Sequence, residues 1–295
     1  MALPAWYSGR VGLSALATAL GGVVADYRKI RRGFHRDTPR PAGWAEPASA
    51  IPDRPSDLSW ARTEPVRTIR QLLQRGLLNP FTWLMAQPNV EGREWVEGLD
   101  RPAILVANHN SHADTPLLLY ALGDRAREKT VVAAAADYFY DNKWRGRLVS
   151  LWLNTFPFAR MGSPAEVLHR SSLLLKSGWN LVVFPEGTRS PDGRIQEFRP
   201  GVGHLASENR VDVVPIHIRG ARRIMPKGRP LPLPAPAAVR IGRPLQISEG
   251  ETSRAFAERV ERSVRALAAD SDEVAVRGSW IDRWNATGAR TPGRR

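Results

Sequence analysis

The chain has 295 residues, of which 42% are hydrophobic and 24% charged, values ordinary for a globular protein that exclude a wholly disordered chain. It contains no cysteine, which excludes disulfides, thiolate metal sites and a cysteine nucleophile, and mildly favours a reducing compartment. The net charge of +14 predicts a surface that attracts phosphate, whether in nucleic acid, lipid headgroups or a phosphorylated substrate. The 10 tryptophans favour a membrane surface, because Trp prefers places that are apolar on one side and wet on the other.

The first 64 residues are predicted to form two segments ahead of the main domain. Residues 1–36 are a basic and apolar extension, whose apolar run 11–25 falls short of the roughly twenty residues that cross a bilayer. Because the basic residues mostly follow this run, a signal peptide is disfavoured, and we expect an ordinary or interfacial helix, with a short single span as the alternative. Residues 37–64 are rich in Pro and Ala, which is typical of a linker.

Residues 65–88 are predicted to be an amphipathic helical segment that docks on a membrane. Apolar side chains recur on one helical face from Val66 to Leu77, with arginines off that face. Asn79-Pro80 then predicts a break, and an aromatic and aliphatic cluster follows at 81–85. A basic amphipathic helix with such a cluster can lie in a membrane interface, apolar side down. The alternative is a helix that packs on the core of its own domain.

From residue 103 the sequence alternates short apolar runs with helical patterns. Strands are predicted at 104–108, 130–135, 181–184, 213–218 and 239–241, and helices at 115–122, 164–176, 201–208 and 253–269. This alternation predicts an α/β domain with a mostly parallel central sheet flanked by helices. Together with the docking segment the domain would span residues 65–270, and residues 271–295 are interpreted as a basic, disordered tail.

The densest polar cluster, residues 108–114 (NHNSHAD), directly follows the first of these strands. Asp114 would stand at the start of the next helix, where backbone N–H groups and the helix dipole favour a carboxylate. There it can accept a hydrogen bond from one ring nitrogen of His109 and leave the other as a base. This is the base-and-orienter half of a Ser-His-Asp arrangement without an enzyme nucleophile, and it suits a reaction in which a substrate hydroxyl attacks.

Other interpretations of this cluster stay open on spacing alone. A histidine that precedes an aspartate is often purely structural. His109, His112 and Asp114 resemble part of a metal site, although further ligands at the expected spacing are absent from the sequence. Ser111 could act as a nucleophile, but it lacks the flanking glycines of a Gly-x-Ser-x-Gly turn.

A second cluster, residues 184–190 (FPEGTRS), ends another apolar strand. Gly187 would let a backbone turn approach a ligand closely, with free N–H groups that favour an anion. Arg189 offers a bidentate fork for phosphate. Glu186 suits an anion site only if it holds Arg189 or the turn in place. Arg160 follows a strand-like run at 156–158 and, taken alone, is interpreted as a surface residue.

In this order the clusters resemble the PlsC-like glycerolipid acyltransferases, the 1-acyl-glycerol-3-phosphate acyltransferase family. The first block of that family, Asn-His-x-Ser-x-x-Asp, matches residues 108–114, and the third, Phe-Pro-Glu-Gly-Thr-Arg-Ser, matches residues 184–190. The second block ends at Arg160, and the fourth, a hydrophobic-Pro block, contains Pro215. The second block lacks the glycine that many members carry several residues before the arginine, so the acceptor is the least defined part of the resemblance.

The resemblance implies an O-acyltransferase that moves a fatty acyl group from acyl-CoA or acyl carrier protein to the free hydroxyl of 1-acylglycerol-3-phosphate, which makes phosphatidic acid. It implies His109 as the general base and Asp114 as the group that orients it, with no covalent acyl-enzyme and no metal or redox cofactor. The substrate-binding residues that it implies are Arg160, Glu186, Gly187, Thr188, Arg189 and Pro215. We expect a peripheral or monotopic protein on the anionic cytoplasmic face of the cell membrane.

Three alternatives to this function remain. The same chemistry could act on glycerol-3-phosphate or on another lysolipid or glycolipid. A catalytically silent member of the family could bind acidic membranes without turnover. A nucleic-acid binder would fit the net charge of +14, but no recognised binding motif is present, so no nucleic-acid partner is expected.

Overall fold

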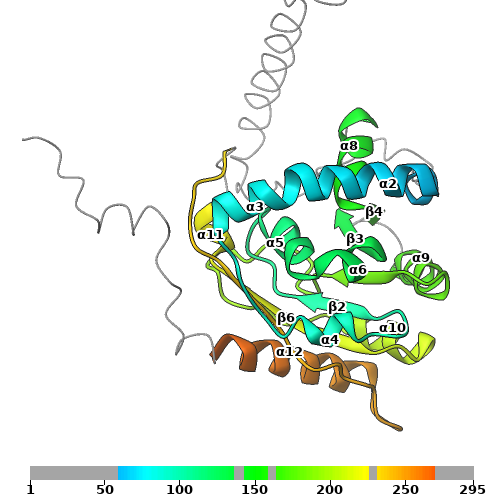
Figure 1. Ribbon diagram of the computed structural model, residues 1–295. Coiled ribbons are helices and arrows are strands. Elements are labelled where there is room, and N and C mark those ends of the chain that lie inside the picture. The colour runs from blue at the N-terminus through cyan, green and yellow to red at the C-terminus, as the bar shows by residue number, and fades with distance from the viewer. Residues whose placement is uncertain (1–58, 136–142, 159–163, 226–230, 270–295) are drawn as a thin grey trace, which may run out of the picture. The chain divides into compact units, whose positions relative to one another are not determined.

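The computed structural model describes residues 59–135, 143–158, 164–225 and 231–269 (Figure 1). The predicted extension, nearly all of the linker, the tail and Arg160 lie outside these described residues.

Within the described segments, seven strands form one sheet in the order β1-β7-β6-β2-β5-β3-β4. The strands are β1 (Asn89–Glu91), β2 (Ile104–Ala107), β3 (Thr130–Ala135), β4 (Thr155–Phe158), β5 (Asn180–Val183), β6 (Val213–Arg219) and β7 (Ala238–Ile241). Every neighbouring pair among these strands is parallel except β6 with β7. The prediction of a mostly parallel sheet is therefore confirmed, and the five predicted strands are all present.

Two strands at the ends of the sheet fall outside the predicted set. β1 has only three residues, too few for an apolar pattern to stand out, and it pairs with β7. β4 pairs only with β3 among the described strands and contains Pro157. An edge strand tolerates proline because the ladder hydrogen bonds on its outer side are not needed.

Helices cover both faces of the sheet, as Figure 1 shows. They are α2 (Glu64–Leu73), α3 (Asn79–Ala86), α4 (Glu94–Glu97), α5 (Asp114–Ala121), α6 (Gly123–Glu128), α8 (Lys143–Leu153), α9 (Pro164–Lys176), α10 (Gly201–Asn209), α11 (Ala221–Ile224) and α12 (Ser253–Ala269). Successive residues of β2 alternate between two apolar cores: Leu105 packs with α3, α5 and α11, and Ile104 packs with α9, α10 and α12. A strand that is buried on both faces reads as a continuous apolar run, which is why the sequence predicted these strands so directly.

The helical arm, residues 64–86, differs from its prediction at Asn79-Pro80. It consists of α2, the π-helical turn η2 (Gln74–Leu78) and α3, which follow one another without interruption. Pro80 stands in the first turn of α3, and the wider π turn changes the hydrogen-bond register just before it. The N–H that proline lacks is therefore not required, and the predicted break at Pro80 was wrong.

The helical arm buries two polar side chains and leaves most of its large apolar side chains exposed. Arg70 is buried, donates to the carbonyls of Ala61 and Leu151 (2.8 Å to Leu151), and has its pKa lowered to about 10 by burial and by neighbouring arginines. Gln74 is also buried and donates to the carbonyl of Trp152 at 2.6 Å. The exposed large apolar side chains of the arm are Ile69, Leu72, Leu77, Phe81, Trp83 and Leu84. Thus polar contacts to the end of α8 hold the first half of the arm, Leu78, Met85 and Ala86 pack on the core near its end, and six large apolar side chains of the arm remain exposed.

Candidate active site

The histidine cluster begins where β2 leaves the centre of the sheet. The buried Asn108 side chain donates from Nδ2 to the Ile218 carbonyl at 3.0 Å, and its Oδ1 accepts the Ile218 N–H at 2.7 Å. These two bonds tie the end of β2 to β6 by a side chain, so that the backbone can turn away at His109. The cluster consequently lies at the carboxyl edge of the parallel strands, where α/β folds commonly bind ligands.

His109 and Asp114 are hydrogen bonded, as the sequence predicted. Nδ1 of His109 lies 2.8 Å from Oδ2 of the fully buried Asp114, which is the first residue of α5. The same carboxylate oxygen accepts the backbone N–H groups of Asn110 at 2.6 Å and Ser111 at 2.7 Å. Thus N–H groups of the loop before the helix hold the carboxylate. Since Oδ2 is an acceptor, we assign the proton to Nδ1 of His109, which leaves Nε2 as the basic nitrogen.

Phe184 fixes the plane of the imidazole from one face. The two rings stack with their centroids 4.3 Å apart and an interplanar angle of 22°. The His109 side chain remains 19% exposed, so part of the ring still reaches solvent. The sequence predicts no role for Phe184 within the FPEGTRS block, because its contact with His109 joins distant parts of the chain.

Glu186 joins the FPEGTRS loop to the histidine loop. It is buried, and its Oε1 accepts the backbone N–H of His109 at 2.8 Å while Oε2 accepts that of Gln196 at 3.1 Å. The N–H of Ser190 in turn donates to the His109 carbonyl at 2.8 Å. Burial raises the pKa of Glu186, and the backbone hydrogen bonds oppose this shift. Glu186 therefore holds the turn in place through the backbone. An acidic residue with this role is compatible with an anion site in the same loop, as expected from the sequence.

Gly187 allows a second arginine to approach this loop. Its φ of 74° is strained for other residues, and an added Cβ would lie 2.8 Å from the guanidinium carbon of Arg199. The Arg199 N–H donates to the Pro185 carbonyl at 3.1 Å, so segment 196–199 backs the turn. Thr188, next in the turn, is exposed. Arg199 was missed as a site residue, because nothing in its local sequence shows which loop it covers.

Arg189 lies close to the histidine cluster. Burial lowers the pKa of His112 to about 3, and the positive charge of Arg189 acts in the same direction. His112 is therefore neutral at physiological pH, with the guanidinium of Arg189 near enough to influence it. Pro215, from the predicted fourth block, is buried in β6 and pairs with Val106 of β2.

The structure gives Ser111 a structural position. It is buried, and its hydroxyl donates to the Met225 carbonyl at 2.8 Å and accepts the Ala113 N–H at 3.1 Å. These bonds argue against its use as a nucleophile. Across the described segments, no group of three or more His, Asp or Glu side chains has a geometry that could hold a metal ion.

Known proteins are similar to this chain in sequence and in fold. A profile of the family described as Acyltransferase matches residues 87–219. The crystal structure of the 1-acyl-sn-glycerophosphate (LPA) acyltransferase PlsC from Thermotoga maritima superposes with a TM-score of 0.52 at 30% sequence identity, covering 72% of this chain and 84% of that one. The chain belongs to the PlsC-like acyltransferase family.

Plant proteins of this acyltransferase family are also similar. A chloroplast 1-acyl-sn-glycerol-3-phosphate acyltransferase of Arabidopsis thaliana is 37% identical over 142 residues, which are 48% of this chain and 38% of that protein. One from Cocos nucifera is 28% identical over 178 residues, which are 58% of this chain and 54% of that protein. The match thus spans about half or less of these relatives. The residues matched by the family profile, 87–219, include the histidine and FPEGTRS loops.

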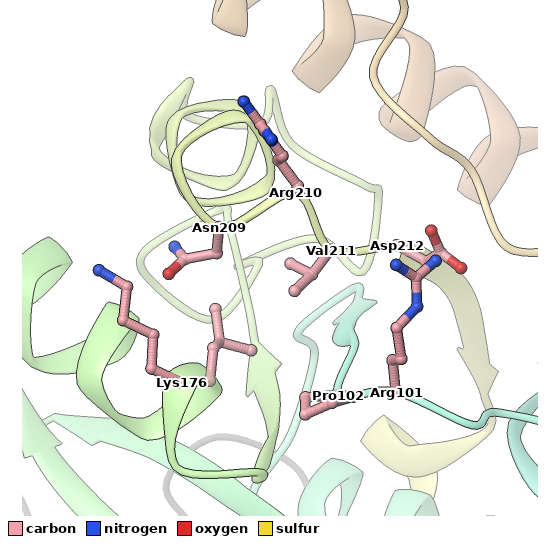
Figure 2. A pocket seen from close by; sticks show the side chains of 8 residues that line it. Arg101, Pro102, Lys176, Asn209, Arg210, Val211 and Asp212 are labelled. Atoms are coloured by element: carbon pink, nitrogen blue, oxygen red, sulfur yellow. The ribbon is translucent and has the colours of Figure 1, made fainter.

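The acyltransferase domain has a separate cavity at the opposite edge of its sheet. This cavity measures about 270 Å³, and its lining side chains are shown in Figure 2. They come from the segments that precede β2, β5 and β6, and include Arg101, Lys176 and Asp212. Because these are the amino ends of strands whose carboxyl ends carry His109 and Glu186, the cavity is distinct from the candidate site.

Proposed function

We propose that this acyltransferase moves a fatty acyl group from acyl-CoA or acyl carrier protein to the free hydroxyl of 1-acylglycerol-3-phosphate, which yields phosphatidic acid. The observation that carries the proposal is the 2.8 Å hydrogen bond from His109 Nδ1 to the buried carboxylate of Asp114. It leaves a basic ring nitrogen at the carboxyl edge of the sheet, beside a loop that holds Arg189. The names of the plant relatives and of the Thermotoga enzyme support the choice of acceptor.

In the proposed reaction, Nε2 of His109 takes the proton of the acceptor hydroxyl as its oxygen attacks the thioester carbonyl. The carboxylate of Asp114 stabilises the imidazolium that forms and keeps the ring oriented, and stacking on Phe184 restrains the ring plane. When the tetrahedral intermediate collapses, the C–S bond breaks and the proton passes from His109 to the departing thiolate. The new C–O bond is the ester of the product. No residue of the enzyme carries the acyl group.

The acceptor phosphate would bind to the arginines of the second and third blocks, Arg160 and Arg189. Gly187 and Thr188 would present the backbone of the turn to it, and Pro215 would border the acyl-donor channel. Glu186 would act through the backbone, because its two oxygens accept the N–H groups of His109 and Gln196. A guanidinium at the phosphate is favourable because its paired N–H groups match two phosphate oxygens.

The helical arm would seat the enzyme on the anionic cytoplasmic face of the cell membrane as a peripheral or monotopic protein. It buries Arg70 and Gln74 and exposes six large apolar side chains, which is unusual for a helix that packs on its own domain. Such a surface can enter the interface with its apolar side down. In the described part of the chain, none of the helices has both the length and the apolar character needed to cross a bilayer.

The test is thioester consumption by the purified protein with palmitoyl-CoA or oleoyl-CoA. Each donor is offered with lysophosphatidate, with glycerol-3-phosphate, with other lysolipids and with no acceptor. Since the chain has no cysteine, a thiol reagent reports only the released CoA. We expect turnover that depends on lysophosphatidate and is abolished by His109→Ala in a protein that stays folded. Retained turnover in this variant would refute the mechanism, and turnover only with another acceptor would replace the proposed substrate.

The phosphate assignment has a separate test. Arg189→Ala should raise the KM for the acceptor more than the KM for the donor, because the lost guanidinium binds the acceptor phosphate. Arg194→Ala is the matched control, since Arg194 lies in the same loop with its side chain 87% exposed. A larger rise in the donor KM would reverse the assignment. Vesicle binding without turnover on any acceptor would favour a catalytically silent member.

A further inference from the structure

The segment 231–237 (LPLPAPA), here called the Leu-Pro segment, has no unpaired backbone donor from residue 232 to residue 237. Every second residue is a proline, which has no N–H. The three intervening N–H groups all donate to carbonyls: Leu233 to Ile224 at 2.7 Å, Ala235 to Met85 at 2.9 Å and Ala237 to Ala86 at 3.0 Å. A backbone without unpaired N–H groups meets the part of the lipid-contact requirement that concerns donors.

The same segment exposes two leucines. Leu231 is 72% exposed and Leu233 is 42% exposed. The hydrogen bonds to Met85 and Ala86 hold the segment against the end of α3, the half of the helical arm that carries Phe81, Trp83 and Leu84 on its surface. The exposed leucines therefore belong to a segment that is held beside the half of the arm with the exposed aromatic side chains.

This surface stands beside the candidate active site. α11 follows β6 directly and contacts α3, and Figure 1 shows the two side by side. The Met225 carbonyl after α11 accepts the hydroxyl of Ser111 in the histidine loop. Arg222 and Arg223 of α11 are exposed, and an added Cβ at Gly193, just past the FPEGTRS loop, would lie 3.2 Å from Nη1 of Arg222. The short helix beside the exposed leucines therefore carries two exposed cations, and Arg222 lies close to the loop that follows the FPEGTRS block.

We propose that the Leu-Pro segment is a second membrane-contacting element, in which Leu231 and Leu233 enter the interface and Arg222 and Arg223 meet anionic headgroups. The proposal rests on the proposed function, in which the acceptor is a lipid. The hydroxyl of a lysolipid lies at headgroup level. Lipid contact directly beside His109 would let that hydroxyl reach the base without extraction of the whole lipid. The helical arm would supply general attachment, and the Leu-Pro segment would orient the site toward the bilayer.

The test uses the absence of cysteine, which lets an environment-sensitive fluorophore be placed on one introduced thiol. Leu231→Cys reports on the Leu-Pro segment and Leu72→Cys on the helical arm, where Leu72 is 66% exposed. Leu173→Cys is the matched control, because this exposed leucine lies on α9, which covers the other face of the sheet. Each labelled protein is mixed with vesicles of phosphatidylcholine and phosphatidylglycerol, with or without lipids that carry a quencher in their chains.

We expect the probes at positions 231 and 72 to shift to the blue and to be quenched by the labelled lipids, while the probe at 173 does neither. If position 72 responds and position 231 behaves like 173, the Leu-Pro segment does not contact lipid and this inference is wrong, while docking by the arm stands. If neither position responds, the membrane docking in the proposed function itself fails. The two failures are therefore distinguishable.

A second measurement does not depend on labels. Leu231→Ser combined with Leu233→Ser should weaken partition onto the same vesicles by about tenfold, because two leucines that would be partly buried in the membrane interface are lost. The unfolding temperature should change little, because Leu231 is 72% and Leu233 42% exposed in the free protein. Leu173→Ser should leave partition as it is. Unchanged partition of the double variant would overturn the proposal.

Discussion

Two replacements of Asp114 distinguish the effect of its negative charge from its role as a hydrogen-bond acceptor in the histidine loop. Asp114 is fully buried, and its Oδ2 receives N–H groups from His109, Asn110 and Ser111. In Asp114→Asn an amide oxygen can still face these donors, so the loop keeps its shape while the negative charge is lost. In Asp114→Ala the acceptor itself is lost. The two variants should therefore fail in different ways.

The magnitudes follow from this geometry. Without the charge, the imidazolium formed in the transition state is no longer stabilised, and kcat should fall by about 10²–10⁴-fold, or about 3–5 kcal/mol of barrier. In the alanine variant the backbone N–H groups of Asn110 and Ser111 remain buried without their acceptor, at about 1–3 kcal/mol each. The summed loss of about 2–6 kcal/mol is a large part of the 5–15 kcal/mol, roughly, that holds a domain folded.

Thioester consumption and urea unfolding, measured on the same preparations, distinguish the two effects. Asp114→Asn should unfold near the wild-type midpoint and lose activity, and Asp114→Ala should lose activity and unfold at clearly lower urea. Wild-type kcat in Asp114→Asn would show that the charge does not assist His109. An alanine variant as stable as the wild type would show that the two N–H groups find other acceptors.

Three further predictions concern the neighbours of the site and the core. The pKa of His112, about 3, is below its unfolded value of 6.5, so the unfolded chain binds the proton first as the pH falls. The free energy of unfolding should therefore decrease as the pH is lowered from 6.5 toward 3, by at most about 1.4 kcal/mol per pH unit. Urea midpoints at pH 7 and pH 5 should differ less in His112→Gln than in the wild type, and an equal difference would contradict the assignment. Phe184→Leu should lower kcat by about tenfold with little change in either KM, because the His109 ring loses its stacking partner. Phe184→Tyr keeps the aromatic ring and should retain the wild-type rate in steady-state kinetics. A change in KM alone would indicate a different role. Gly203→Ala should lower the free energy of unfolding by at least about 1–3 kcal/mol, the cost of an overpacked core, because the added Cβ lies 2.0 Å from the Ser253 carbonyl oxygen. Its unfolding temperature should therefore fall, whereas that of Gly76→Ala, whose added Cβ has nothing within 4 Å, should not.

The sequence alone determined the elements at the centre of the fold. A strand buried on both faces is a continuous apolar run, so β2, β3, β5, β6 and β7 could be predicted from composition along the chain. Helices α9 and α12 have the bounds that their apolar spacing predicted. The pair of His109 and Asp114 could also be predicted, because both residues belong to one strand-to-helix turn, and short-range geometry follows from local sequence.

Only the tertiary structure decided which side chains act on that pair. Phe184 and Glu186 reach His109 across a sequence separation that no local pattern encodes, and Arg199 covers Gly187 through the folding of a later loop. The same is true of the helical arm. Its periodicity showed that one face is apolar, but whether that face turns inward or outward depended on Arg70 and Gln74, whose acceptors are carbonyls of α8 about eighty residues away. Periodicity fixes the faces of a helix, and the partners that bury one of them are supplied by the rest of the chain.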